Sequence, residues 1–378
     1  MDFIGSEDME TSGKYHFLPM RLLPKLNARL SKPVALDLKR PQQKSYPPIH
    51  GLYLLLRASG LAYVQQRGKK SYLQLDEQGL ASWHSLNPTE RYFTLLESWL
   101  VRGDPQILGE RGYFASGGIR NWPIFFQRFP DRSLQVAGNQ KVESLLPYEP
   151  TLCTLALLEL FGIVTLGHAK PEPGKGWQVA RIEHTGFGDA MTQVLFGKEL
   201  ISQVLFARQE DQPAAILHTK FAPFFPEWRH HLVLSEPESL EGVYVFKVSL
   251  GSVWARIAIP SDGLLEDLSA SILNAYEFDF DHLYCFTYVN RFGIAGHVNH
   301  PDMDEPQWAD EVTIGELGLT PGMVMTYRYD FGDNWQFQVL LERVEPPNST
   351  VKQAKLLDLH GKPPSQYGDD DDDDGWWD

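Results

Sequence analysis

In the first half of the chain, the spacing of apolar residues changes several times between that of a helix and that of a strand. An apolar helical stretch ends at Gly60, and Leu61–Gln65 and Tyr72–Leu75 then read as two short strands joined by a turn. Asp76 follows as the N-cap of another helix, and an Asn-Pro pair at 87–88 begins a further one with a single apolar face. The pattern predicts helix, hairpin and capped helix in that order.

The same order recurs about a hundred residues later. Leu54–Leu61 (LLLRASGL) corresponds to Leu157–Ile163 (LLELFGI), and each is followed by strand, turn and strand. We interpret this as a degenerate internal repeat. Helices followed by a β-hairpin are typical of a winged helix, so we expect two winged-helix-like α/β units, at 1–144 and 145–238. The aromatic segment Phe221–Trp228 is expected to pack on the second of them.

A polar, proline-containing stretch at 235–239 predicts a domain boundary, and the domain after it is expected to span 241–368. Apart from a short turn-like helix at Val312–Leu317, its elements follow the order β, β, α, β, β, β. The expected elements are Gly242–Leu250, Val253–Ile259, Leu265–Ala275, His282–Val289, Val324–Tyr329 and Trp335–Val344. Strands grouped around one main helix indicate an α+β fold with a mixed or antiparallel sheet.

Composition and charge narrow the class of protein. Of the 378 residues, 43% are hydrophobic and 22% charged, which predicts a soluble globular protein of two or three domains. We expect no secretory signal and no membrane anchor, because the apolar runs are far shorter than a membrane span needs. Two cysteines, Cys153 and Cys285, cannot form a disulfide framework, so we expect buried thiols and a reducing cytoplasm.

The net charge of −15 is unevenly distributed. Residues 1–144 hold 19 basic and 13 acidic side chains, whereas residues 145–378 hold 15 and 36. The first part therefore carries +6 and the rest −21. Because of this uneven charge distribution, the amino-terminal half could bind nucleic acid although the whole chain is acidic.

Four segments of the carboxy-terminal domain carry a resemblance to a known family. They are Tyr244–Leu250 (YVFKVSL), Val253–Ile257 (VWARI), His282–Phe286 (HLYCF) and Tyr327–Trp335 (YRYDFGDNW), the last followed by Leu340, Leu341 and Glu342. The domain resembles the plasmid pRiA ORF-three-like family, also labelled insertion-element passenger TnpR-like. The resemblance covers roughly 242–345 and implies an α+β fold and an association with plasmids or mobile elements. It implies no known reaction.

Two positions depart from the family's pattern. The family usually has a His two residues after the motif Trp, where this chain has Phe337. The family's Pro-Pro-Glu-Asp tail is only echoed, by Pro363-Pro364-Ser365-Gln366. Any metal or acid–base role that the resemblance would give to that His or that Glu is therefore in doubt.

The YDFGDNW motif offers a candidate ligand pocket. Asp330 and Asp333 bracket a tight turn beside Trp335, and His282 is expected to arrive from a neighbouring strand. Such a set suits a divalent cation or a polar ligand. The alternative is that both carboxylates only accept backbone N–H groups of the turn. The segment at 297–304 (HVNHPDMD) is also rich in ligand side chains, but we expect a surface loop there.

Basic side chains in the first half form the candidate DNA-binding set. The turn of the first hairpin and the residues near it would contact phosphates and give salt-dependent binding. The set is Lys39, Arg40, Lys44, Arg57, Arg67, Lys69 and Lys70. The alternative is a solvated basic face used for protein contacts.

The chain ends in an acidic tail at 369–378, which contains six consecutive carboxylates, Asp369–Asp374. A solvated tail is the simple interpretation, and competition with DNA for the basic half is the sharper one.

Taken together, these features favour a non-enzymatic DNA-associated accessory protein of plasmid or mobile-element context, with no cofactor. A protein partner is kept open, and no contact with a membrane is expected. The alternative is a metal-dependent enzyme or a small-ligand-binding protein whose site lies in the carboxy-terminal domain. No serine-recombinase centre and no phosphate-binding Gly-rich loop is visible in the sequence.

Overall fold

The computed structural model describes residues 9–67, 70–109, 125–126, 131–196, 213–235, 241–290, 292–347 and 350–367. The chain forms two compact units. Unit 1 comprises Met1–Gln65, Lys70–Ser235 and Phe292–Ile294, and unit 2 comprises Gln66–Lys69, Glu236–Arg291 and Ala295–Asp378. Helices and strands are both abundant, at 32% and 27%, which confirms the α+β class. Among the described residues no helix is long and apolar enough to cross a membrane.

The first half of unit 1 consists of short strands and four helices. Its elements are β1 (Met9–Glu10), α1 (Leu23–Asn27), α2 (Pro47–Ala58), β2 (Ala62–Arg67), β3 (Lys70–Leu75), α3 (Glu77–Ser85) and α4 (Pro88–Arg102). Short 3-10 turns lie at Met20–Leu22, Gln43–Ser45 and Pro105–Leu108. The predicted caps are present: Asp76 accepts the Gly79 N–H at 2.6 Å, and Asn87 and Glu90 form a capping box.

The second half of unit 1 repeats this connection order. Its elements are β4 (Ser133–Gln135), α6 (Gln140–Leu145), α7 (Leu152–Leu160), β5 (Val164–His168), β6 (Val179–His184), α8 (Gly186–Phe196) and α10 (Pro213–Phe221). The two three-stranded sheets have matching orders, β1-β3-β2 and β4-β6-β5, so in each an upstream strand pairs with the far strand of the hairpin. β4 lies ahead of position 145, where the sequence places the second unit, because this long-range pairing leaves no local signal.

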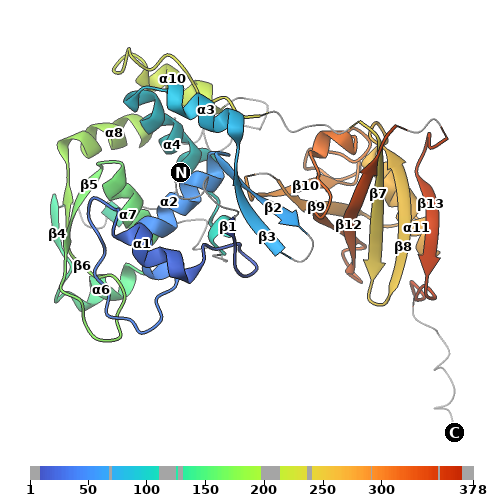
Figure 1. Cartoon of the computed structure of the whole chain (residues 1–378), viewed down its shortest axis with the longest axis horizontal. Coiled ribbons are helices and arrows are strands. Elements are labelled where there is room, and N and C mark those ends of the chain that lie inside the picture. Colours follow the sequence, from blue (N-terminus) through green and yellow to red (C-terminus); the bar gives the residue numbers. More distant parts are fainter. Residues whose placement is uncertain are drawn as a thin grey trace, which may run out of the picture. The chain divides into compact units, whose positions relative to one another are not determined.

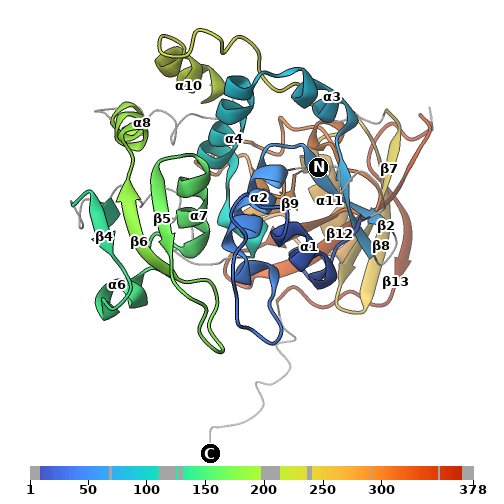
Figure 2. The same ribbon diagram turned by 60° about the vertical axis from the view of Figure 1, so that its left-hand side comes forward.

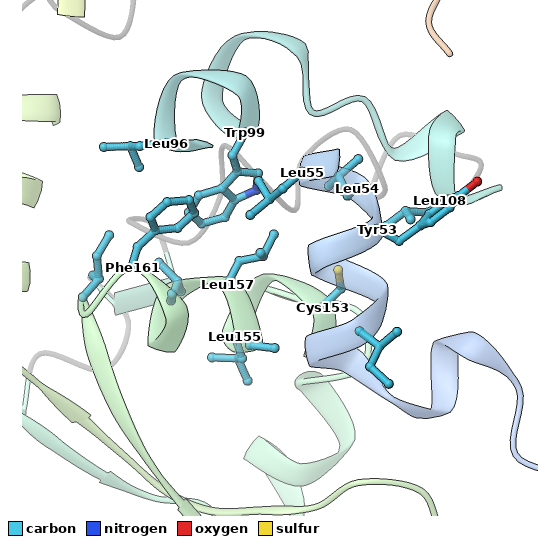
Figure 3. Close-up of a cluster of buried hydrophobic side chains, with 14 of the residues drawn as sticks. Tyr53, Leu54, Leu55, Leu96, Trp99, Leu108, Cys153, Leu155, Leu157 and Phe161 are labelled. Carbon is cyan, nitrogen blue, oxygen red and sulfur yellow. The ribbon is translucent and has the colours of Figure 1, made fainter. Parts of the chain in front are cut away.

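Helices α2 and α7, which occupy equivalent places in the two repeats, pack against each other (Figure 2). They approach closely at Gly51, where an added Cβ would lie 2.8 Å from Leu157 Cγ. Trp99 of α4 stacks on Phe161 over this contact, with ring centroids 5.2 Å apart (Figure 3). The core of unit 1 is therefore shared between the repeats.

The aromatic segment Phe221–Trp228 packs on α4 of the first repeat as well as on α10 of the second, where the Trp228 ring lies 4.9 Å from that of His218. Trp228 stacks on Phe93 with centroids 4.1 Å apart, and Phe221 and Phe225 flank the same ring. Glu90 holds the chain beyond it by accepting the backbone N–H of His230 at 2.8 Å. The sequence did not predict the contact with α4, because aromatic composition indicates that a segment is buried but not which surface it covers.

The described residues of unit 2 form one seven-stranded antiparallel sheet with one long helix (Figure 1). Its elements are β7 (Val243–Leu250), β8 (Val253–Pro260), α11 (Leu265–Tyr276), β9 (Tyr284–Val289), β10 (Ala295–Asn299), β11 (Val324–Tyr329), β12 (Trp335–Glu345) and β13 (Lys355–His360), with a 3-10 turn at Gly315–Leu317. The strand order is β10-β9-β11-β12-β7-β8-β13. The sequence did not predict the two edge strands, and β10 occupies the start of the expected 297–304 loop.

One face of this sheet and α11 enclose an aromatic core. Tyr244, Phe246, Phe286, Tyr327 and Phe337 are all fully buried in it. Phe337, the position at which the family has a His, thus takes part in packing and not in a polar site. Alternate residues of the strands point to the other face, where polar side chains predominate.

Candidate functional sites

The basic residues of unit 1 fall into paired and unpaired groups. Lys39, Arg40 and Lys44 are exposed, and within the described residues none has a carboxylate at ion-pair distance. Lys70, in contrast, bonds Glu10 at 2.8 Å. Arg57 is buried, at 4% exposure, and its guanidinium donates to the Tyr53 hydroxyl at 3.1 Å. Arg67 is exposed at the end of β2 and is assigned to unit 2, and Lys69 lies outside the described residues.

The unpaired cations belong to a segment at 21–44 that contains seven basic residues and one acid. Hydrogen bonds between side chains and backbone hold this segment in place, although little of it is helical. Asn27 exchanges two hydrogen bonds with the backbone of Val34, both 2.8 Å long, and Gln43 accepts the Leu18 N–H at 2.9 Å. The Asp37 carbonyl accepts the Gly174 N–H at 2.8 Å, which joins the segment to the turn of the β5–β6 hairpin. We call residues 21–44 the basic segment.

Helix α2, which precedes the first hairpin, is poorly placed to read a ligand. Nine of its twelve residues are buried, because it packs between α4 and α7. Its exposed apolar residue, Leu52, is 37% accessible. Its buried surface is therefore not available to a ligand.

In unit 2 the structure brings His282 and Asp330 together. The His282 Nε2 lies 3.5 Å from Asp330 Oδ2 and 3.6 Å from Asp281 Oδ1. Asp330 has a positive φ of 52° and its Oδ1 accepts the Gly332 N–H at 2.8 Å, so it also serves the turn. Asp333 is exposed and does not join the pair.

Trp335 belongs to the core side of the sheet. It pairs with Tyr329 across the hairpin and packs edge-on against Phe278 at 5.0 Å. Its side chain therefore packs against the core of unit 2 and is not part of the His282–Asp330 pair.

Sequence reasoning missed the residues that fix this pair. The buried Tyr329 hydroxyl accepts the backbone N–H groups of Asp281 and His282, each at 3.2 Å, and donates to the Asp279 carbonyl at 2.6 Å. Gln366, in the echoed family tail, accepts the Asp279 N–H at 2.6 Å. These two residues lie 87 positions apart, so no local sequence pattern signals the contact.

Tyr367 completes the cluster by donating its hydroxyl to Asp281 Oδ2 at 2.8 Å. This hydrogen bond to a carboxylate raises the pKa of Tyr367 to about 12. The same bond is the main cause that lowers the pKa of Asp281, so this carboxylate is charged at neutral pH. The arrangement favours binding of a cation or a hydrogen-bond donor.

A metal centre finds no support among the side chains described. No group of three or more His, Cys, Asp or Glu residues in the described ranges is arranged to hold a metal ion. In the former loop candidate, His297 lies on β10 with Nδ1 3.2 Å from Thr287 Oγ1 and 3.8 Å from Cys285 Sγ. His300 faces Asp302 instead, and burial raises the pKa of the Cys285 thiol.

The fold of unit 2 defines an antiparallel α+β domain with a single long helix. Residues 243–370 match the family model of the plasmid pRiA4b ORF-3-like proteins, which confirms the resemblance of the carboxy-terminal domain. A crystal structure of a protein of unknown function from Methanosarcina mazei Go1 shares 26% identity; the alignment covers 33% of this chain and 72% of that one, with a TM-score of 0.30. No curated protein matches the chain. The acidic run Asp369–Asp374 lies outside the described residues.

Proposed function

We propose that unit 1 binds DNA through phosphate contacts and that the chain is a non-enzymatic accessory protein of plasmid or mobile-element context. The observation that carries this proposal is the set of exposed, unpaired cations on the basic segment, Lys39, Arg40 and Lys44. A cation without a carboxylate partner can neutralise a phosphate without first giving up an ion pair. The family's plasmid association and two free, buried cysteines suit this role in a reducing cytoplasm.

The proposed binding is independent of base sequence. Helix-turn-helix proteins read bases with a recognition helix that enters the major groove. If each repeat is interpreted as winged-helix-like, α2 would be that helix, yet it is buried against α7. Contacts to phosphate position a protein on DNA but carry no direct sequence information. Unit 1 therefore holds the duplex without reading it.

The test compares two triple variants of the full-length protein. Lys39→Ala, Arg40→Ala and Lys44→Ala remove unpaired cations. Lys32→Ala, Lys70→Ala and Lys175→Ala remove the same charge from residues that bond Glu159, Glu10 and Glu172. Binding to a short DNA duplex is measured as a function of salt.

The first triple should reduce the slope of log affinity against log salt by up to about 2.7, since each phosphate contact contributes about 0.9. The control triple should change it far less. Absence of binding at low salt, or equal losses in both triples, would refute the proposal. Comparable affinity for two unrelated duplexes is expected, and a strong preference for one would refute the phosphate-only mode.

A second candidate function is the binding of a small ligand at the His282–Asp330 pair, which is supported by their 3.5 Å approach. The metal-dependent version of this function has less support, because Asp333, the third expected ligand, is exposed and is not part of the His282–Asp330 pair. Metal analysis of the purified protein tests it directly.

A further inference from the structure

An exposed apolar surface surrounds the His282–Asp330 pair. Phe280 is 59% exposed, Tyr367 49%, Leu283 39% and Phe331 38%. Contacts with the pair place three of them: the Leu283 carbonyl accepts the N–H of Asp330, the residue before Phe331, at 3.1 Å, and the ring of Tyr367 lies 6.5 Å from that of His282. Phe280 directly precedes Asp281 in the chain. Large apolar side chains are normally exposed singly, so such a group marks an interaction surface.

Carboxylates border these rings. The side chain of Asp281 is 54% exposed, Asp279 and Asp333 are exposed, and Asp330 keeps one oxygen toward His282. Asp281 is held in place by the Tyr367 hydroxyl, which donates to its carboxylate, and by the Tyr329 hydroxyl, which accepts its backbone N–H. The negative charge is therefore fixed beside the aromatic rings and needs little ordering when a partner arrives. We call this region the aromatic–acidic surface.

The surface already shows which cation it accommodates. The guanidinium of Arg328 lies 4.6 Å from the centre of the Phe331 ring, and its Nη2 is 3.5 Å from the Phe331 carbonyl. A planar guanidinium stacks on aromatic faces and pairs with carboxylates, whereas an ammonium group does so less well. Rings such as Phe280 and Tyr367 offer further faces of the same kind.

We propose that the aromatic–acidic surface docks an arginine-bearing, apolar segment of a protein partner. The guanidinium would lie between the exposed rings and the Asp281 and Asp333 carboxylates, while apolar neighbours cover Leu283 and Phe331. Charge complementarity selects this occupant, because the same carboxylates repel phosphate and so exclude DNA. The inference is independent of DNA binding by unit 1.

Three labelled ten-residue peptides serve as probes, with alternating Arg/Leu, Arg/Ser or Glu/Leu. Binding to the full-length protein is measured by fluorescence anisotropy at physiological salt. Arg/Leu should bind at least about tenfold tighter than either other peptide, because only it satisfies both the rings and the carboxylates. Equal binding of Arg/Leu and Arg/Ser would indicate charge attraction alone and would overturn the proposal.

Two variants locate the binding. Phe280→Ser with Phe331→Ser should weaken Arg/Leu binding by about tenfold, because it removes a cation–π contact at Phe280 and an apolar contact at Phe331. Val324→Ser with Leu357→Ser removes equally exposed apolar side chains elsewhere in unit 2 and should have no effect. If the first double variant does not fold, Asp333→Asn against Asp262→Asn gives the same comparison at two exposed carboxylates. Equal effects in either matched pair overturn the docking site.

Discussion

Glu90 is a buried carboxylate on which unit 1 depends. Its side chain is 1% exposed and accepts the backbone N–H groups of Asn87, Arg229 and His230 at 2.8–3.0 Å, together with the His230 ring at 2.9 Å. Burial alone would raise the pKa of Glu90, but these hydrogen bonds outweigh it and lower the pKa to about 2. The charged form is therefore part of the folded structure.

The expected contribution follows from linkage. A pKa of about 2 in the folded state, against an ordinary 4.5, corresponds to about 3 kcal/mol at most. A glutamine at this position keeps one accepting oxygen, so we expect a loss of about 2 kcal/mol. Because the folded pKa is depressed, this stability is fully present above about pH 5 and is lost as the pH falls toward 2. Glu90→Gln removes the charge at almost constant volume.

The assay is urea unfolding of the wild type and Glu90→Gln between pH 7 and pH 2.5. Hydrogen exchange of α4 and of residues 226–235 gives the local readout, since a chain of two units need not unfold in one step. The variant should be about 2 kcal/mol less stable at pH 7, and the difference should shrink below pH 5. Glu77→Gln, at an exposed position on α3, is the control. A difference that is absent at pH 7, or that persists unchanged to pH 2.5, would refute the reasoning.

Two further predictions concern the cores. Gly51→Ala should destabilise unit 1 by about 1–3 kcal/mol in thermal or urea unfolding, because its Cβ would meet Leu157, whereas Gly186→Ala, with open space around it, should be neutral or slightly stabilising. Ser269→Ala should cost unit 2 about 1–3 kcal/mol, because it leaves the buried Tyr327 hydroxyl, now 2.7 Å from Ser269 Oγ, without a partner. Adding Tyr327→Phe should recover part of that loss, and a double variant less stable than Ser269→Ala would contradict this explanation.

Local signals made several elements predictable. Asp76 and Asn87 cap helices because their side chains reach N–H groups three residues away, a distance that the sequence itself encodes. The β11–β12 hairpin is also predictable from local sequence, because its turn residues lie between two apolar runs. Matching spacing in the two halves of unit 1 also predicts the repeat, which the matching strand orders of the two sheets bear out.

The elements that escaped prediction lack such local signals. β13 is exposed along its whole length, so no alternation between apolar and polar positions marks it. β10 is short and contains a glycine, and its pairing with β9 alone defines it as a strand. Asp279 and Gln366 meet across 87 positions of sequence, and no spacing rule connects them. The features that the sequence did not predict are thus mostly defined by hydrogen bonds between residues far apart in the chain.

Burial of α2 and α7 bears on what kind of DNA contact unit 1 can make. Each repeat alone would leave an apolar helix in solvent, and packing the two helices together removes both surfaces from water. The same packing removes the helix that a single winged-helix-like unit would present to the major groove. Packing the two repeats together in this way stabilises the fold and leaves neither helix free to contact bases in the major groove. In the proposed binding mode the duplex is held outside this helix pair, by the unpaired cations of the basic segment.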